Sequence, residues 1–403
     1  MSLRNLDLRE ATRLVRAGVP ALGVETVSLA QAVGRVLAVP VIAARDQPPF
    51  RSSAMDGYAL RRSDIATGAV LKIAGASVAG RRFTGPLSAG EVVRIFTGAP
   101  VPGGLDAVAI QENTVARDGF VELTAEAVAT GDHIRRAGQD FTAGATLLDA
   151  DQRLDAWKLS LAAAAGAAEL TVRRKPRIAV LCNGDELVPV GGAPGPDQIF
   201  ESASVAVTTL IAQWGGEAIV LGTEGDDLDA LYATLSRVEA DLIVTIGGAS
   251  VGDHDLVKPA LERLGLKLDF VSLNLRPGKP TSFGVLANGS HVLGVPGNPA
   301  SAFVVVQLLL KPWIESALGL PDRDPFVKAV TLRDIPANGP RETYLRATLG
   351  VSDDGRLQVE AFNDQDSSLI SVFARAGALV RIPSHAALTP AGSLVDILCL
   401  ERL

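Results

Sequence analysis

The segment from Lys175 to about residue 310 alternates short apolar strands with helical stretches, and this constrains the fold more than any other feature of the 403-residue chain. Such alternation is typical of a doubly wound α/β domain, in which helices cover both faces of a parallel sheet. Asn298 as an N-cap, followed by Pro299, marks the start of the last helix. We expect strands at 177–183, 217–222 and 241–248, a strand pair near 268–273 and 291–295, and helices at 202–214, 228–238, 256–264 and from Pro299.

The residues on both sides of this segment predict three further parts. Residues 6–17 have apolar positions at helical spacing, and Asp155 can cap a helix that reaches about Gly166. Short β-branched runs and Gly/Pro turns fill the stretch between these helices. We therefore predict a multidomain α/β and β protein with four domains: 1–44 plus 141–174 as an elongated helical domain, 45–140 as an inserted β-rich lobe, 175–324 as the α/β domain, and 325–403 as a small C-terminal β domain.

Charge, cysteine usage and hydropathy limit the classes of partner. The 38 Lys+Arg against 45 Asp+Glu give a net charge of −7, whereas binding to nucleic acid or to an anionic membrane requires a basic surface. Cys182 and Cys399 lie in separate apolar runs, which favours free thiols in a reducing compartment. The N-terminus lacks the apolar stretch of a signal peptide, and the runs 159–168 and 302–310 are too short to span a bilayer. We expect a cytoplasmic protein that has no nucleic-acid or membrane partner.

The loops that follow the predicted strands are rich in glycine and carboxylates. In an open parallel sheet, ligands bind at the carboxyl ends of the strands. Glycine lets the backbone approach a ligand, carboxylates bind Mg²⁺, and N–H groups near Ser250 and Asn298 can bind an oxyanion. We therefore expect phosphate and Mg²⁺ here, although any one such loop is more typical of a plain turn. The loops are 183–186 (NGDE), 222–227 (GTEGDD), 247–255 (GGASVGDHD) and 294–299 (GVPGNP).

Three other patterns bear on the chemistry. The segment 276–280 (RPGKP) places two cations in a turn stiffened by proline, which fits an anion clamp or a solvated basic turn. Asp56 in the lobe stands beside Gly57, where an Asx turn is the common explanation. The four histidines have no zinc-site spacing, and no Walker loop or G-x-S-x-G elbow is present. Zinc hydrolases, serine hydrolases and P-loop NTPases are therefore disfavoured.

Taken together, these segments resemble the molybdopterin molybdenumtransferases, the MoeA family, whose animal counterpart is the E domain of gephyrin. The resemblance runs in the family's order from about residue 5 to the C-terminus. Two of its motifs, GGxSVGxxD and PGNPxS, are shared with the adenylyltransferase domain of the same pathway, so only the ordered set indicates the reaction. The motifs are SSAMDGYA (52–59), IFTGAPVPGGLDAV (95–108), IRRAGQDFTAG (134–144), NGDEL (183–187), GGASVGDHD (247–255), RPGKP (276–280) and GVPGNPASAF (294–303).

The resemblance implies a homodimer with a MogA-like molybdopterin-binding central domain, a dimerising helical domain and a C-terminal domain similar to a β-barrel. Such an enzyme takes adenylylated molybdopterin (molybdopterin-AMP) and molybdate, inserts molybdenum into the dithiolene and releases AMP, with Mg²⁺ assisting. The cleft is expected between the central domain of one subunit and the lobe of the other. The molybdopterin adenylyltransferase and downstream cofactor-handling proteins are the implied protein partners.

The resemblance also implies roles for individual residues. The expected catalytic residues are Asp56, Thr97, Glu186, Asp226 and Asp255, of which Glu186, Asp226 and Asp255 are expected to bind the metal. Either Arg341 or Arg346 matches a cation on the pterin side. The expected substrate-binding and cofactor-binding residues are Gly248, Ser250, Gly252, Arg276, Lys279, Pro296, Gly297, Asn298, Ser301, Arg346 and Ser367.

The chain departs from the family pattern at three positions. Arg276 replaces a lysine, Asn183 replaces a serine or threonine, and Ala203 replaces an asparagine. The amide lost at Ala203 leaves open a divergent molybdopterin-binding paralogue. Two further alternatives are an adenylyltransferase, which needs only the central domain, and a non-enzymatic dimeric scaffold, which has no need for carboxylates and cations around one crevice.

Overall fold

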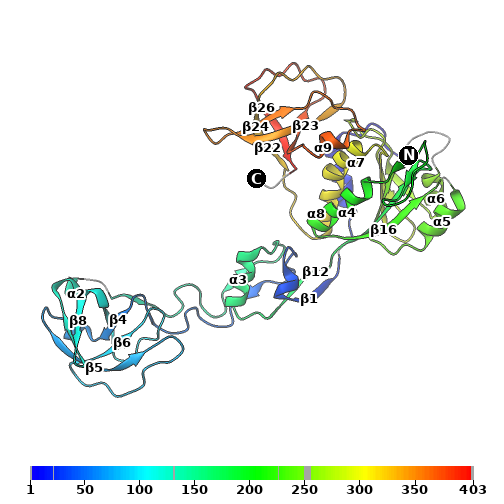
Figure 1. The fold of residues 1–403 in the computed structure, drawn as a ribbon. Helices are drawn as coiled ribbons and strands as arrows, with labels where there is room; N and C mark the ends of the chain where they lie inside the picture. The colour runs from blue at the N-terminus through cyan, green and yellow to red at the C-terminus, as the bar shows by residue number, and fades with distance from the viewer. Residues whose placement is uncertain (1, 21, 130–131, 226, 249–255, 401–403) are drawn as a thin grey trace. The chain divides into compact units, whose positions relative to one another are not determined.

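The computed structural model describes residues 2–20, 22–129, 132–225, 227–248 and 256–400, which form two compact units (Figure 1). The first unit consists of Met1–Glu25 and Arg173–Leu403, and the second consists of Thr26–Val172. The second unit is thus an insertion into the first.

A six-stranded sheet forms the centre of the first unit. Its order is β16-β13-β17-β21-β20-β18, and the first four strands are parallel, which confirms the predicted α/β domain. The antiparallel strand β20 was not predicted, because its four residues follow a Pro/Gly turn too closely to show a pattern of their own. The strands are β16 (Glu217–Glu224), β13 (Arg177–Asn183), β17 (Leu242–Ile246), β21 (His291–Val295), β20 (Ser282–Val285) and β18 (Lys267–Phe270).

Helices cover both faces of this sheet. Alternate residues of a strand point to opposite faces, and Ala179 and Leu181 of β13 share a core with α5 (Leu228–Ser236) and α6 (Val257–Arg263). Helix α4 (Ala203–Trp214) packs against β13 and β16. Figure 1 shows α4 and α8 on one side of β16 and α5 and α6 on the other. The sheet is therefore buried on both faces, as its nearly continuous apolar strands predict.

The last helix of this domain contains a π turn. Helix α7 (Pro299–Val305) continues through η4 (Val306–Leu310) into α8 (Lys311–Ala317). Pro312 donates no N–H, so the regular hydrogen-bond ladder cannot continue through it. Among the described residues, only the run Pro299–Ala317 is long and apolar enough to cross a membrane, and 78% of its most apolar window is buried inside the protein. Such burial is typical of a core helix.

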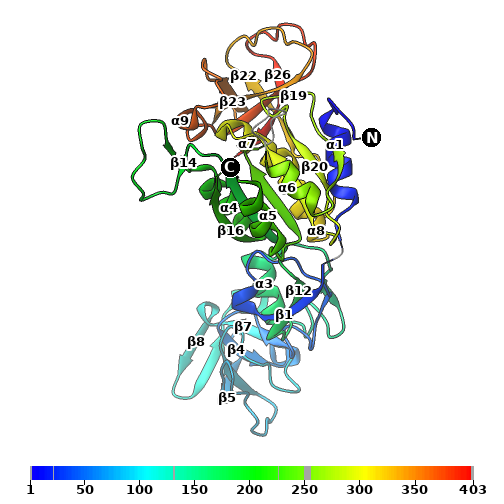
Figure 2. The same ribbon diagram turned by 90° about the vertical axis from the view of Figure 1, so that its right-hand side faces the viewer.

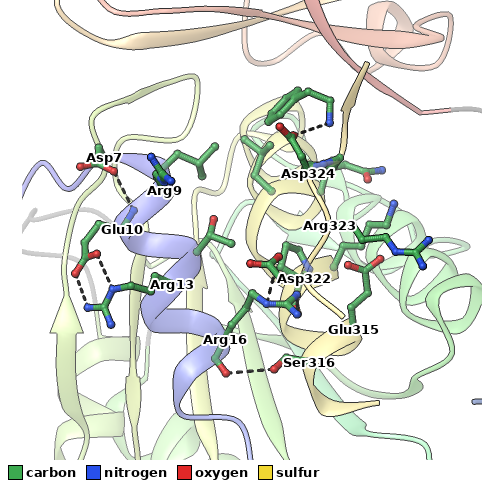
Figure 3. Close-up of a pocket in the computed structure, with 18 of the residues that line it drawn as sticks. Asp7, Arg9, Glu10, Arg13, Arg16, Glu315, Ser316, Asp322, Arg323 and Asp324 are labelled. Carbon is green, nitrogen blue, oxygen red and sulfur yellow. Dashed lines mark hydrogen bonds and ion pairs between the residues drawn. The ribbon is translucent and has the colours of Figure 1, made fainter. Parts of the chain in front are cut away.

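Helix α1 (Leu8–Ala17) packs in the first unit (Figures 2 and 3). The Arg16 guanidinium donates to the carbonyl oxygens of Pro312 and Leu320, each at 3.2 Å, and forms an ion pair with Asp322. This arrangement differs from the expectation that 1–44 and 141–174 form one domain. The local pattern predicts the helix correctly, but its docking site lies about 300 residues further along the chain.

The C-terminal domain is a closed barrel, as predicted. Five strands close in the order β23-β24-β22-β26-β25, and β25 pairs with β23. Strand β19 (Leu275–Arg276) of the central domain pairs with β23 and so joins the two domains. The elements are β22 (Phe326–Thr331), β23 (Glu342–Val351), β24 (Leu357–Ala361), α9 (Ile370–Phe373), β25 (Ala378–Ile382) and β26 (Leu394–Cys399).

The second unit contains one core built from both of its chain ends. Asp155 caps α3 (Ala156–Ala164) by accepting the Lys158 N–H, as predicted. This part contains more strand than the expected helical domain, because its β-branched runs pair with one another. Its other elements are β1 (Val24–Ser28), which pairs with β12 (Glu169–Arg173), η1 (Leu29–Ala32), and β2 (Val41–Ile42), which pairs with β11 (Thr146–Leu148).

The inserted lobe is a six-stranded sheet with its own cores, in the order β7-β4-β6-β5-β9-β8. Its strands are β4 (Gly57–Leu60), β5 (Val70–Ser77), β6 (Glu91–Ile95), β7 (Ala107–Ile110), β8 (Thr114–Arg117) and β9 (Phe120–Leu123). The short elements around it are β3 (Ser52–Ser53), which pairs with β10 (Ile134–Arg135), η2 (Arg62–Asp64), η3 (Gln111–Asn113) and α2 (Ala125–Ala129).

A buried hydrogen bond joins α8 to the sheet. The Trp313 indole N–H donates to Nδ1 of His291 on β21 over 2.7 Å, and the Phe283 ring meets the imidazole edge-on. Burial lowers the pKa of His291, although Asp269 opposes this. The neutral imidazole therefore serves as an acceptor in the core.

The variant Trp313→Phe is expected to lower the unfolding free energy of the first unit by roughly 2–4 kcal/mol, because it leaves a void and an unpaired Nδ1. Urea unfolding followed by circular dichroism measures this loss. Trp214→Phe, at a half-buried position in the same unit, is the control. If both variants lost the same unfolding free energy, the hydrogen bond between Trp313 and His291 would have no specific role in stability.

Candidate active site

Loops at the carboxyl ends of the parallel strands meet at one edge of the central sheet. A Cβ added at Gly247, which follows β17, would lie 2.5 Å from the Asn183 carbonyl oxygen at the end of β13. A Cβ at Gly297, which follows β21, would lie 3.4 Å from Cα of Gly247. Gly247 and Gly248 also have φ values of 89° and 61°, which favour glycine. Glycine thus allows these loops to approach one another closely.

Two carboxylates stand at this edge within the described chain. The Glu186 carboxylate lies against Gly184, and a Cβ at Gly225 would meet Asp185 Oδ1 at 2.9 Å. The loop after β13 therefore contacts the loop after β16. Among the described residues, no group of three or more His, Cys, Asp or Glu side chains could hold a metal ion. The predicted residues Asp226, Ser250, Gly252 and Asp255 lie outside the described residues.

The loop after β21 contacts the C-terminal barrel. Nδ2 of Asn298 lies 3.2 Å from Ser367 Oγ, and the Ala300 N–H donates to the Ser367 carbonyl at 3.1 Å. Pro296 is buried, whereas Gly297 and Asn298 are exposed. One N–H group of the α7 N-terminus is therefore used inside the protein, and the loop joins the edge of the sheet to the barrel.

A cavity of about 510 Å³ lies between the central domain and the barrel. It contains four cationic side chains from two segments: Arg276 and Lys279 from the turn after β19, and Arg341 and Arg346 from the barrel. None of the four forms an ion pair with another described residue. Two predicted hydroxyl residues, Ser301 and Ser367, and the unpredicted residues Asn338, Gln365 and Asp366 also line the cavity. No local sequence pattern marked these three, since the barrel fold alone brings them here.

Arg346 is the most unusual of these cations because its side chain is fully buried, with 0% of its surface exposed. Nη2 donates to the Asp366 carbonyl oxygen at 3.0 Å, but Nε and Nη1 have no hydrogen-bond acceptor within the described chain. Burial lowers the pKa of Arg346, and Asp364 and Asp366 oppose this. A guanidinium retains its charge in proteins, so a buried positive charge that has no ion-pair partner among the described residues lies in the wall of the cavity.

The turn that carries Arg276 and Lys279 is held from several directions. The Leu273 and Thr281 N–H groups donate to the Lys279 carbonyl at 2.9 Å, and Thr281 Oγ1 donates to the Gly278 carbonyl at 2.7 Å. Gly278 has a φ of 112°, and a Cβ there would meet Val305 at 2.7 Å. The turn is thus rigid, as expected for an anion clamp, while both cationic side chains remain exposed.

The lobe carries a separate polar cluster. Asp56 Oδ1 accepts the Thr97 backbone N–H at 2.7 Å and its hydroxyl at 2.8 Å. These two bonds, together with the charge of Arg94, hold the pKa of Asp56 below its usual range. Asp56 therefore binds a residue 41 positions away rather than closing a local Asx turn. Arg94 of β6, which the sequence reasoning missed, has its guanidinium carbon 4.8 Å from the centroid of the Phe96 ring.

Two of the three departures from the family pattern, Asn183 and Ala203, lie beside the edge of the sheet. Ala203 is buried at the start of α4. The buried Glu201 carboxylate accepts the Ser204 N–H at 2.7 Å and contacts the Cys182 thiol at 3.2 Å. Burial raises the pKa of Cys182, so this thiol remains protonated. Glu201 therefore caps α4 and links it to the end of β13, where Asn183 is also buried.

A larger cavity of about 1,200 Å³ lies between α1, α8 and the segment before β22 (Figure 3). Many of its charged side chains pair with one another or with near neighbours, as Arg13 does with Glu10 and Arg381 with Glu342. Its six cationic side chains are interspersed with five carboxylates, whereas the four cations of the smaller cavity share its lining with one carboxylate, that of Asp366.

Comparisons with known proteins agree with this architecture. Residues 6–166 match the family model described as "MoeA N-terminal region (domain I and II)". Residues 179–316 match "Probable molybdopterin binding domain", and residues 328–400 match "MoeA C-terminal region (domain IV)". The three matches cover most of the chain in the order of the observed domains.

Whole-chain relatives show the same likeness. The molybdopterin molybdenumtransferase of Haemophilus influenzae is 34% identical over 93% of each chain, and molybdopterin molybdenumtransferase 2 of Mycobacterium tuberculosis is 34% identical over 97% of this chain and 98% of its own. The crystal structure of a molybdopterin biosynthesis MoeA protein from Pyrococcus horikosii superposes with a TM-score of 0.83 at 28% identity, covering 99% of this chain and 100% of that one. The chain therefore belongs to the MoeA family of molybdopterin molybdenumtransferases.

Proposed function

We propose that the chain inserts molybdenum from molybdate into adenylylated molybdopterin and releases AMP. The observation that carries this proposal is the buried, incompletely bonded guanidinium of Arg346, which shares one cavity with Arg276, Lys279 and Arg341. Like charges at close range repel, and a buried charge is costly unless it is paired. An oxyanion such as molybdate or a substrate phosphate in the cavity supplies the counter-charge that these cations lack.

The cavity supports recognition of a tetrahedral oxyanion in particular. A guanidinium presents a planar fork of donors, and an ammonium presents a compact charge that can follow it. The hydroxyls of Ser301 and Ser367 add neutral donors at the same cavity. These groups bind and orient the oxyanion, and in a partly buried site each interaction is stronger than in water. Positioning the oxyanion beside the pterin lowers the entropy cost of transfer.

Mg²⁺ fits the donor set at the edge of the sheet. Asp185 supplies carboxylate oxygens near Gly225 and Glu186 supplies them near Gly184, and hard cations prefer oxygen ligands. We propose that Glu186, together with Asp226 and Asp255, holds the ion. When bound, Mg²⁺ supplies positive charge next to phosphate oxygens.

The alternatives account for fewer of these observations. An adenylyltransferase would leave the cations of the barrel and the Asp56–Thr97 cluster of the lobe without a role. A scaffold has no physical use for a buried cation whose N–H groups lack acceptors. The homodimer and the cytoplasmic location also remain proposals, and the dimer is supported by large exposed apolar side chains outside the lobe in the second unit, namely Val33, Val39, Ile42 and Trp157.

Molybdate-dependent release of AMP tests the function directly. The purified chain is incubated with adenylylated molybdopterin, Mg²⁺ and increasing molybdate, and AMP and pterin-bound molybdenum are quantified. We expect AMP release to rise with molybdate and to match the molybdenum inserted. Release of AMP without molybdate, or binding without any release, would contradict the proposal.

The variant Arg346→Gln tests the oxyanion site. We expect it to weaken molybdate binding in equilibrium dialysis by at least about tenfold, because one charge-assisted hydrogen bond contributes about 1.5–3 kcal/mol. The melting temperature should stay the same or rise, since the variant removes a buried charge. Arg356→Gln, at an exposed cation on the same barrel, is the control. Equal affinities in both variants would place the oxyanion elsewhere.

The variant Trp157→Glu tests the dimer. Trp157 is 83% exposed in the single chain, and burial of such an indole between two copies would be disrupted by a carboxylate. We expect sedimentation equilibrium to show a dimer for the wild type and a shift toward monomer for Trp157→Glu. Val70→Glu, at an exposed apolar residue of the lobe, should remain dimeric. A monomeric wild type would refute the dimer, and a dimeric Trp157→Glu would exclude this surface.

A further inference from the structure

We infer that Arg94 is a positioning residue that fixes the orientation of the Asp56 carboxylate in the lobe. The inference rests on the proposed function for the role of Asp56, but its geometry is independent of that function. Arg94 acts on the main chain that follows the Asp56 side chain, and Thr97 holds the carboxylate itself.

The start of β4 fixes where Asp56 lies. Gly57 is the first residue of β4, and it pairs with Ile95 of β6 on one side and Ile110 of β7 on the other. A Cβ at Gly57 would overlap the Ala109 carbonyl oxygen, so only glycine permits this approach. Asp56 therefore leaves the sheet at a point that its neighbouring strands define.

Arg94 contacts the main chain on the C-terminal side of Asp56, once directly and once through Gln111. Its Nη1 donates to the Gly57 carbonyl at 2.9 Å, and its Nη2 donates to Oε1 of Gln111. The Gln111 backbone N–H in turn donates to the Asp56 carbonyl at 3.0 Å. One guanidinium thus connects the carbonyl after Asp56 with the residue that binds the carbonyl of Asp56.

Two aromatic rings hold the guanidinium in this place. Its carbon lies 5.0 Å from the ring centroid of Tyr58 and 4.8 Å from that of Phe96. Tyr58 is the direct cross-strand partner of Arg94, and Phe96 directly follows the last residue of β6. Cation–π contacts of this kind each contribute about 0.5–2 kcal/mol. The planar fork and the two rings suit arginine, and a lysine cannot reproduce both donors.

This arrangement leaves one oxygen of Asp56 available. Oδ1 accepts both Thr97 donors, whereas Oδ2 accepts no hydrogen bond from a described residue. Arg94 does not contact this oxygen and does not pair with the carboxylate. It influences Asp56 through the main chain and through its charge, which helps to lower the pKa of that carboxyl. Oδ2 is therefore the atom that meets a substrate.

Arg94→Gln, Arg94→Lys and Asp56→Asn test the inference, with Arg117→Gln as a matched control at an exposed arginine of the same sheet. We expect Arg94→Gln to lower the turnover number for AMP release by about 10- to 100-fold with little change in KM, because small misplacements of a reacting group have this effect. Arg94→Lys retains the positive charge but loses the pair of donors that the guanidinium presents, so this variant should be only partly active. Arg117→Gln should match the wild type.

A double-mutant cycle separates positioning from general stability. If Arg94 acts through Asp56, the combined variant Arg94→Gln/Asp56→Asn should be no slower than Asp56→Asn alone. Additive losses, or a wild-type rate for Arg94→Gln, would overturn the inference. If Arg94→Gln folds poorly, Arg94→Lys provides the same cycle.

A titration of the Asp56 carboxyl by ¹³C NMR does not depend on activity. Arg94→Gln should raise the pKa of Asp56, since it removes a nearby cation and loosens the Thr97 bonds, and Arg117→Gln should leave that pKa unchanged. An unchanged pKa in Arg94→Gln would contradict the inference. If the wild-type chain releases no AMP, the proposed function is refuted. If Arg94→Gln still raises the pKa of Asp56 above its wild-type value, the positioning role stands.

Discussion

A guanidinium buried with two of its nitrogens unbonded is the constraint on which the candidate site depends. Arg346 lies within the barrel wall, and three further cations open into the same cavity without ion-pair partners among the described residues. Burying such a charge is unfavourable unless an anion is present. The folded chain is therefore complementary to a bound oxyanion, and ligand binding is expected to stabilise it by mass action. These cations do not stabilise the free protein, so binding of a ligand better explains why they are gathered in one cavity.

This cavity and the edge of the sheet form one connected surface through a short segment. The loop after β21 carries Asn298, which meets Ser367 of the barrel, and Ser301 lines the cavity one turn into α7. Strand β19 makes a second connection, because it pairs with β23 just before the Arg276 turn. The barrel is thus an integral part of the site. A ligand with a nucleotide at one end and an oxyanion at the other could contact both regions of the first unit.

Local patterns predicted the elements well and their long-range contacts poorly. The parallel strands, the Asp155 cap and the barrel strands follow from periodicity and capping chemistry, which act over a few residues. The docking of α1 depends on Arg16 reaching a carbonyl about 300 positions away. The local sequence around Arg346 predicts only a cation in a strand, because the burial of this side chain depends on closure of the barrel. The resemblance to a family named these cavity residues, whereas spacing alone left the RPGKP turn and Asp56 undecided.

The two units differ in how fully their cations are paired. In the lobe, the cation Arg94 is fully engaged by a carbonyl, an amide and two rings, so it offers little to an anion. The lobe presents instead the free oxygen of Asp56. In the first unit, the cavity cations have no ion-pair partner and attract anions. The cavity of the first unit is therefore suited to an oxyanion, and the lobe carboxylate is suited to accept a hydrogen bond or a proton.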